Sequence, residues 1–311
     1  MNIVTIIMLL VGFFLLVKGA DLFVEGASDL ATKLKVPAMI IGLTIVAFGT
    51  SAPETAVSIT SALEHSNAIA ISNVVGSNIF NLLAVIGATS VICKIKLDYS
   101  ILKQDYLFLV IGSVLFLIFI LSGRVLSSLE GFIFIVIICA YVGAIIYKIK
   151  HDNKDMPVGN VHLSNMRIIL YIILGLVFIL YGSDVVVASA KEIALSLGMS
   201  ETLVGLTIVS IGTSLPELIT SITAAYHKNT DLALGNVLGS CIFNIFMIIG
   251  LTTFITPIAV TPVMIIDVII MLVCVIITYV LAYDKSDFNK KDGIILLILF
   301  IIYMAYIIIR N

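Results

Sequence analysis

Apolar residues occur in ten long runs along this chain, separated by short polar stretches. About 20 apolar residues in a helix cross a hydrocarbon core of about 30 Å, and each run is long enough to do so. Backbone groups in lipid must be hydrogen-bonded within their own segment, so the runs predict helices. We therefore expect an all-α membrane protein with ten transmembrane helices, near residues 2–30, 37–64, 68–92, 104–122, 127–147, 167–195, 202–227, 231–256, 262–282 and 291–309.

The composition excludes a soluble protein. Hydrophobic residues make up 61% of the chain and charged residues 12%, whereas soluble domains carry about 25% charged residues. The net charge of -2 offers no basic surface for nucleic acid, so the lipid bilayer is the expected partner. The first apolar run continues into further apolar turns and is expected to be retained as a helix. Without paired spacing, the four cysteines are expected to be small buried apolar residues: Cys93, Cys139, Cys241 and Cys274.

Positive charges in the loops predict the orientation in the membrane. With the N-terminus outside, thirteen Lys and Arg residues fall in inside loops and three in outside loops. Cytoplasmic loops carry the excess of Lys and Arg, so both termini are expected outside the cell. The sequence thus predicts a multi-pass protein of a prokaryotic plasma membrane.

The two halves of the chain repeat each other. After a shift of 163 residues, ten of thirteen positions in 42–54 are identical in 205–217, and seven of nine in 73–81 are identical in 236–244. Each half holds five predicted spans, and an odd number makes the second half enter from the opposite side. We therefore expect two inverted five-helix repeats, an arrangement common in secondary transporters. The predicted units are 1–147 with a motif at 42–81, a cytoplasmic linker at 148–166, and 167–311 with a motif at 205–244.

The second and seventh spans are predicted to break near their centres. The second contains Gly49 and Pro53, and proline removes a helical hydrogen bond. We expect this break to free carbonyls such as that of Ala47, and the matching break in the seventh span to free that of Ser210. Free carbonyls at membrane depth occur only where protein or a water-filled cavity satisfies them, and a bound cation would do so.

Glu54 and Glu217 fall at these breaks. A charged side chain at mid-membrane costs about 2.5–3.5 kcal/mol on insertion scales. No Lys or Arg lies at comparable depth in the neighbouring spans. We favour a bound cation over the alternatives of a helix cap, a protonated acid or an ion pair.

Hydroxyls and amides surround both glutamates in the sequence. Single residues of these types would more often bond to backbone carbonyls or join helices. Together they form an all-oxygen set, which suits Ca²⁺, Na⁺ or Mg²⁺ rather than Zn²⁺ or copper. Asp21 and Asp184 are expected at the membrane interface, and His65 and His227 in solvated loops. The candidate ligands are Thr50, Ser51, Asn73, Ser77 and Asn81 in the first half and Thr213, Ser214, Asn236, Ser240 and Asn244 in the second.

Twin Gly-Thr-Ser-x-Pro-Glu motifs, each followed by Gly-Ser-x-Ile-Phe-Asn, resemble the repeats of the cation/Ca²⁺ exchanger superfamily, and most closely its prokaryotic Na⁺/Ca²⁺ exchangers. The resemblance implies a cluster of ion sites at mid-membrane, with the first and sixth spans sliding across the other eight. It implies that Glu54 and Glu217 are shared by Ca²⁺ and Na⁺, and that Asn81 and Asn244 close the central site. Members often carry aspartate at the position of Asn244. The resemblance further assigns Thr50 and Thr213 to Ca²⁺, and Ser51, Ser214, Ser77, Ser240, Ala47 and Ser210 to flanking Na⁺ sites.

The predicted function is secondary antiport of Ca²⁺ against Na⁺ by alternating access. Coupling to H⁺ or K⁺, or transport of another divalent cation, stays open as an alternative, with a cation channel as a weaker one. The chain contains no Walker-type motif, which disfavours an ATP-driven pump. No His or Asp accompanies the glutamates in the motif spans, so neither an enzyme nor a cofactor is expected. The oligomeric state is left open, and a monomer is compatible with the sequence.

Overall fold

The computed structural model describes residues 3–64, 67–97, 102–123, 125–151, 161–199, 208 and 210–310. Within these residues it contains eight helices that are long and apolar enough to cross a membrane, and one bent helix pair that would make a ninth span. The protein is thus an all-helical membrane protein. Most of the seventh predicted span before Ser210 lies outside the described residues.

Several spans are built from consecutive short segments, some of them π-helical, rather than from one α-helix. The elements are α1 (Ile3–Leu34), α2 (Ala38–Ile41), η1 (Gly42–Val46), α3 (Ala47–Thr50), α4 (Ala52–Leu63), α5 (Asn67–Phe80), η2 (Asn81–Val85), α6 (Ile86–Ile92), β1 (Ile95–Lys96), η3 (Leu102–Tyr106), α8 (Leu107–Ser122), β2 (Val125–Leu126), α9 (Ser128–His151), α10 (Asn165–Ser196), α12 (Ser210–Gly212), α13 (Leu215–Tyr226), α14 (Thr230–Phe243), η5 (Asn244–Ile249), α15 (Gly250–Ile255), β3 (Ile258–Ala259), α16 (Pro262–Lys285), β4 (Asp287–Phe288) and α17 (Lys290–Arg310).

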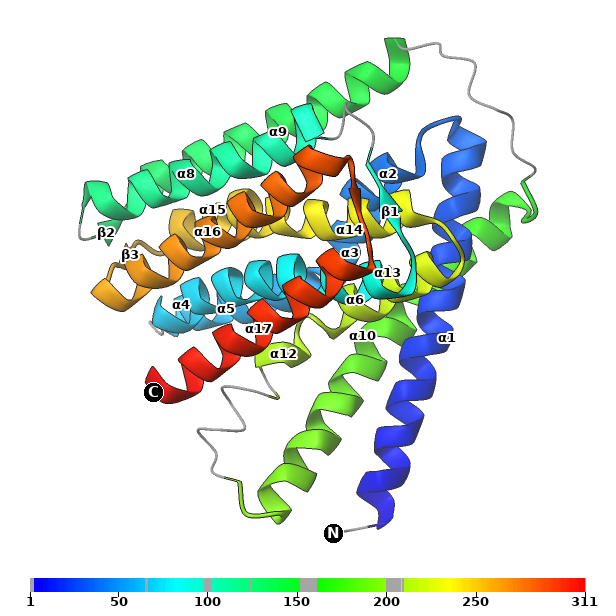
Figure 1. Cartoon of the computed structure of the whole chain (residues 1–311), viewed down its shortest axis with the longest axis horizontal. Helices are drawn as coiled ribbons and strands as arrows, with labels where there is room; N and C mark the ends of the chain where they lie inside the picture. Colours follow the sequence, from blue (N-terminus) through cyan, green and yellow to red (C-terminus); the bar gives the residue numbers. More distant parts are fainter. Residues whose placement is uncertain are drawn as a thin grey trace.

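Helices α1 and α10 lie side by side along one flank of the molecule (Figure 1). Glycines allow their backbones to touch. A Cβ added at Gly175 would lie 2.6 Å from the backbone nitrogen of Phe23 and 2.8 Å from the carbonyl oxygen of Gly19. Small residues at such contacts let transmembrane helices pack closely where no hydrophobic effect drives them together.

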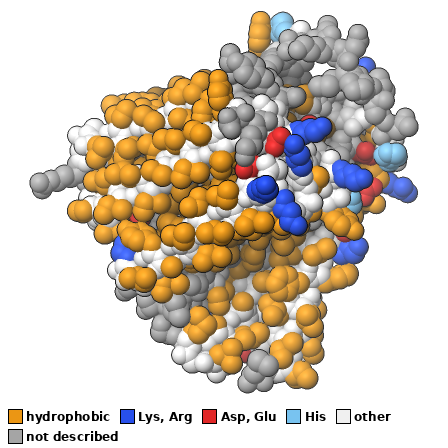
Figure 2. Space-filling view, viewed as in Figure 1, with side chains coloured by type: hydrophobic (Ala, Val, Ile, Leu, Met, Phe, Trp, Pro, Cys, Tyr) orange, Lys and Arg blue, Asp and Glu red, His pale blue; other side chains and the backbone are white. Residues whose placement is uncertain are grey.

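The spans formed by α5–η2–α6 and α14–η5–α15 form the centre of the protein. Nearly every side chain of α14 is buried, including Asn236 and Ser240. Outer helices such as α9 and α17 instead expose many apolar side chains. Apolar side chains also predominate over the left and lower parts of the face shown in Figure 2. This pattern is expected for a protein whose solvent is lipid, and it places the polar motif residues on the innermost helices.

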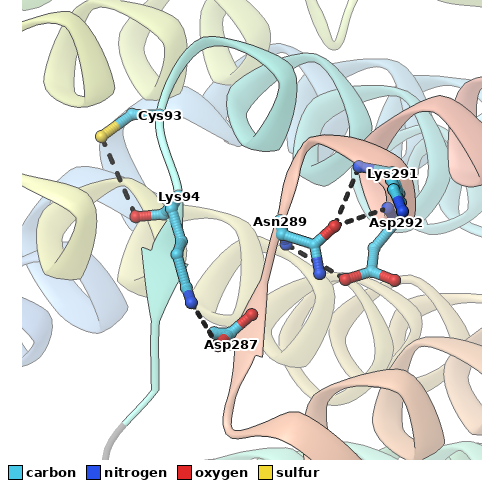
Figure 3. A network of polar contacts seen from close by, with 6 residues as sticks. All are labelled: Cys93, Lys94, Asp287, Asn289, Lys291 and Asp292. Carbon is cyan, nitrogen blue, oxygen red and sulfur yellow. Dashed lines mark hydrogen bonds and ion pairs between the residues drawn. The ribbon is translucent and has the colours of Figure 1, made fainter.

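Two small antiparallel strand pairs join loops that are distant in sequence, β1 to β4 and β2 to β3. Beside the first pair, the ammonium of Lys94 lies 2.7 Å from a carboxylate oxygen of Asp287. The Asn289 side-chain oxygen accepts the backbone N–H of Lys291 at 2.9 Å, which caps the start of α17 (Figure 3). The ion pair and the β1–β4 pairing fasten the start of α17 to the loop after α6.

Helix α9 continues to His151 and α10 begins at Asn165, so both helices reach into the two ends of the predicted linker at 148–166. The structure corrects one expectation of lesser importance. Cys241 and Cys274 are buried as predicted, but Cys93 is half-buried and Cys139 is exposed. Apolar residues on an outer helix such as α9 can face lipid and need no burial within the protein.

Candidate cation-binding site

The second span breaks where its sequence predicts. The segments 38–50 and 52–63 meet at an angle of 47°, and Pro53 lies in the first turn of α4. The predicted freeing of the Ala47 carbonyl is wrong, because this oxygen accepts the backbone N–H of Ser51 at 3.0 Å. Proline at position 53 removes only the helical donor four residues after Gly49. The Gly49 carbonyl accepts a backbone N–H at the end of α3 instead, and the Ala47 carbonyl keeps its donor.

The second motif breaks in the same way between α12 and α13, with Pro216 in the first turn of α13. Here Pro216 deprives the Gly212 carbonyl of its helical donor. The hydroxyl of Ser183, on α10, donates to this carbonyl at 3.0 Å and replaces the missing bond. Ser210 begins α12 next to residues outside the described part of the chain.

The two breaks place their glutamates in one buried cluster. Glu54 and Glu217 are each 1% exposed. Each accepts a hydrogen bond from the serine of the other motif: Ser51 donates to Glu217 Oε1 and Ser214 to Glu54 Oε1, both at 3.0 Å. The two motifs therefore form a single site.

The third and eighth spans contribute matching donors. Ser77 donates to Glu54 Oε1 at 3.5 Å, and Ser240 to Glu217 Oε1 at 3.4 Å. The Asn73 amide nitrogen donates to the backbone carbonyl of Glu54 at 3.1 Å. The Asn236 amide nitrogen makes the equivalent bond to the Glu217 carbonyl at 3.4 Å. Both asparagine amides thus fix the motif backbone, the joining role that the sequence left as an alternative.

Two asparagines lie where α5 and α14 pass into π-helical turns. Neither amide atom of Asn81 has a hydrogen-bond partner among the described residues, although the residue is fully buried. The Asn244 nitrogen donates to Asn78 Oδ1 at 2.9 Å, and its oxygen has no partner there. Buried polar groups are normally hydrogen-bonded, so the two unpartnered amide oxygens suit a bound cation.

The same observation holds for both carboxylates. Glu54 Oε2 and Glu217 Oε2 are buried and have no hydrogen-bond partner in the described part of the chain. The hydroxyl of Thr213 is likewise unpartnered, whereas that of Thr50 donates to Asn236 Oδ1 at 3.1 Å. An unpaired charge buried at this depth is expensive. A hard cation would be stabilised by these oxygens.

Sequence reasoning missed Ser58 and Ser221, which accept hydrogen bonds from Asn73 and Asn236 at 2.9 and 3.0 Å. Both occupy the same position in the 163-residue repeat, so the repeat could have revealed them. It missed Ser183 because the equivalent residue is Ala20. Among the loop residues, His227 Nε2 lies 3.3 Å from a carboxylate oxygen of Asp21, and His65 lies outside the described residues.

The chain is similar to known proteins over almost its whole length. A model of the family described as "Sodium/calcium exchanger protein" matches residues 4–147 and 167–309. The chain is 40% identical to the "Putative antiporter CaxA" of Alkalimonas amylolytica, covering 82% of each chain. It is 32% identical to the sodium/calcium exchanger MaX1 of Methanosarcina acetivorans, covering 97% of this chain and 98% of the relative. The solved structure of the sodium-calcium exchanger NCX_Mj soaked with Na⁺ and Sr²⁺ matches with a TM-score of 0.86 and 28% identity, covering 98% of this chain and 99% of that one.

Proposed function

Because the chain belongs to the sodium/calcium exchanger family, we propose that it exchanges Ca²⁺ for Na⁺ across a cell membrane by secondary antiport. The observation that carries the proposal is the buried pair Glu54 and Glu217, each with one carboxylate oxygen that has no hydrogen-bond partner among the residues that the structure describes. Both cations are hard and prefer oxygen ligands, so they can compete for one set of oxygens. Competition at a site that opens to one side at a time couples the two fluxes without ATP.

In this proposal the two glutamates bind both ions. The side-chain oxygens of Asn81 and Asn244 complete the central site, since both are buried and neither has a hydrogen-bond partner within the described part of the chain. Ser51, Ser77, Ser214 and Ser240 lie within hydrogen-bond distance of the carboxylates and can turn their lone pairs toward a cation. Thr50, Thr213 and the carbonyl of Ser210 are the remaining proposed ligands, and the Ala47 carbonyl is left out because it accepts the backbone N–H of Ser51.

The proposed architecture is ten transmembrane helices in two inverted repeats, 1–147 and 167–311. Matching hydrogen bonds support it, because Ser51 to Glu217 and Ser214 to Glu54 exchange places under the 163-residue shift. The same shift carries β1 onto β3, and it carries β2 to within one residue of β4. A site at the repeat interface is typical of such transporters.

The two repeats differ in how their helices close over the site. Helix α1 packs along α13, whereas the equivalent helices α10 and α4 make few or no contacts among the described residues. Ser28 of α1 accepts a hydrogen bond from the Asn229 amide, at the corner between α13 and α14, at 2.8 Å. Because the positive-inside rule places this corner in the cytoplasm, we propose that the conformation is closed to the cytoplasm and faces outward.

Ion flux into proteoliposomes tests the proposed exchange. With Na⁺ loaded inside and none outside, Ca²⁺ should enter against its gradient, and equal Na⁺ on both sides should stop net uptake. Uptake that follows a pH gradient and ignores Na⁺ would refute the assignment of Na⁺ as the exchanged ion. Empty liposomes and a K⁺ gradient in place of Na⁺ are the controls.

Replacing Asn244 by aspartate is expected to steepen the dependence on Na⁺. The central site has only the two glutamate charges, which one Ca²⁺ neutralises, so several Na⁺ ions together would overcharge it. A third carboxylate should therefore raise the Hill coefficient for Na⁺ and the Na⁺ affinity. Flux measured against Na⁺ concentration tests this. Asn78→Ala, which removes the hydrogen-bond partner of Asn244 without adding a charge, is the control, and an unchanged Hill coefficient in Asn244→Asp would contradict the charge argument.

A further inference from the structure

Ser183 is the side chain of the α1–α10 pair that the structure shows bonded to the backbone of an ion-binding motif. It is 3% exposed, and its hydroxyl donates to the Gly212 carbonyl at 3.0 Å. Gly212 directly precedes Thr213 and Ser214, and Ser214 donates to Glu54. A hydroxyl from α10 is therefore hydrogen-bonded to the backbone segment that positions Ser214 beside Glu54.

The bond has no counterpart in the first repeat. Under the 163-residue shift Ser183 corresponds to Ala20, which has no hydroxyl to offer the Gly49 carbonyl. The surroundings of the two glycines differ accordingly. The atoms nearest to a Cβ added at Gly212 belong to Val187, one helical turn after Ser183, whereas those nearest to one at Gly49 belong to Leu176 and Phe23.

Inverted repeats make this difference informative. In such transporters the opposite access state arises when each repeat adopts the conformation of the other. Gly212 would then have the surroundings that Gly49 has here, with Phe13 and Val186 as the equivalents of Leu176 and Phe23. Ser183 would leave Gly212, and Ala20 could not form a replacement bond at Gly49.

We propose that Ser183 is a positioning residue for ion exchange, whose bond to the Gly212 carbonyl forms in only one of the two access states and favours that state. The inference rests on the proposed inverted repeat and on alternating access. A net buried hydrogen bond changes an equilibrium by about five-fold. Ser183 therefore favours the state in which α1 packs on α13, by a factor of that order. It binds no ion itself and acts on ion affinity through the population of each state.

Cross-linking of two symmetry-related cysteine pairs measures the state ratio without any ion flux. Asp21→Cys with His227→Cys reports the state seen here, since His227 Nε2 and a carboxylate oxygen of Asp21 lie 3.3 Å apart. Asp184→Cys with Glu64→Cys, at the equivalent positions, reports the opposite state. Ser183→Ala should lower the ratio of the first cross-linking rate to the second by about five-fold, and Ser183→Thr, which keeps the hydroxyl, should restore it.

Two further variants distinguish a change in the ratio of access states from a general loss of folding. Ser113→Ala removes a buried serine hydroxyl that donates to its own helix, at the Leu109 carbonyl, and should leave the ratio unchanged. Ala20→Ser supplies the missing hydroxyl in the first repeat and should lower the ratio as Ser183→Ala does. A ratio unaffected by both Ser183→Ala and Ala20→Ser would overturn the proposal.

Transport provides the second readout. In proteoliposomes Ser183→Ala should lower the apparent KM for Ca²⁺ at the cytoplasmic face and raise it at the outer face, with Ser183→Thr close to wild type. Equal changes at both faces would overturn the proposal, because they indicate a purely structural role. Wild-type protein that moves Ca²⁺ without Na⁺ would refute the proposed exchange, while the cross-linking result for Ser183 would still stand.

Discussion

Replacing Glu54 or Glu217 by glutamine is expected to abolish Na⁺-dependent Ca²⁺ uptake while leaving the protein folded. Glutamine keeps the size of the side chain and can still accept the serine hydrogen bonds at 3.0 Å, but it removes the charge that a cation needs. Breaking a buried charge pair by removal of one partner costs about 3–5 kcal/mol, which corresponds to more than about a hundred-fold in affinity. Each single variant should therefore fall to the uptake of empty liposomes.

The loss should appear in binding as well as in flux. Isothermal titration of Ca²⁺ into detergent-purified protein should show binding in wild type and none in either variant. Glu64→Gln is the matched control, since Glu64 ends the same helix as Glu54 but is exposed; it should bind and transport Ca²⁺ as wild type does. Normal Ca²⁺ binding in both Glu54→Gln and Glu217→Gln would show that the glutamates are structural and would remove the basis of the proposed site.

The features that could be predicted from the sequence are those that local rules or the repeat determine. Runs of apolar residues predicted most of the spans, and Pro53 predicted the position of a break that the structure bends by 47°. The repeat singled out Glu54 and Glu217 before any geometry was known, and their serines proved to be bonded across the two motifs. Such predictions are possible for membrane proteins because unpaired backbone polar groups and buried charges are costly in lipid, so each one in the sequence indicates a specific structural feature.

What could not be predicted depends on contacts between distant helices. The sequence gives no indication that Ser51 bonds to Glu217 rather than to its own helix, because that choice depends on how two breaks face each other. The sequence does not single out Ser183 either, because its equivalent in the first half is Ala20 and the repeat identifies only residues that match in both halves. The expectation of a free carbonyl at Ala47 is wrong because a proline affects the carbonyl four positions earlier. For Pro53 that carbonyl belongs to Gly49, and the Ala47 carbonyl stays hydrogen-bonded.

The substitution Gly175→Val is expected to force α1 and α10 apart and to reduce exchange through loss of folded protein. The added Cβ would lie 2.6 Å from the Phe23 nitrogen and 2.8 Å from the Gly19 carbonyl oxygen. Both neighbours are backbone atoms, so no change of rotamer can relieve the clash and no smaller residue can compensate across the interface. Overpacking costs about 1–3 kcal/mol even where side chains can adjust, and here the helices must separate.

The result should appear as a lower yield of monodisperse protein in detergent and a melting temperature lowered by several degrees, with flux lost in proportion. Gly143→Val is the matched control, because this glycine lies in α9, is exposed, and has no atom within 4 Å of an added Cβ; its melting temperature should not fall. A Gly175→Val protein that melts and transports as wild type does would show that α1 and α10 do not touch along their backbones. The contact matters for exchange because Ser183 can stabilise one access state only if α1 and α10 move as a pair. The bond between Ser183 and Gly212 would then break when α1 separates from α13.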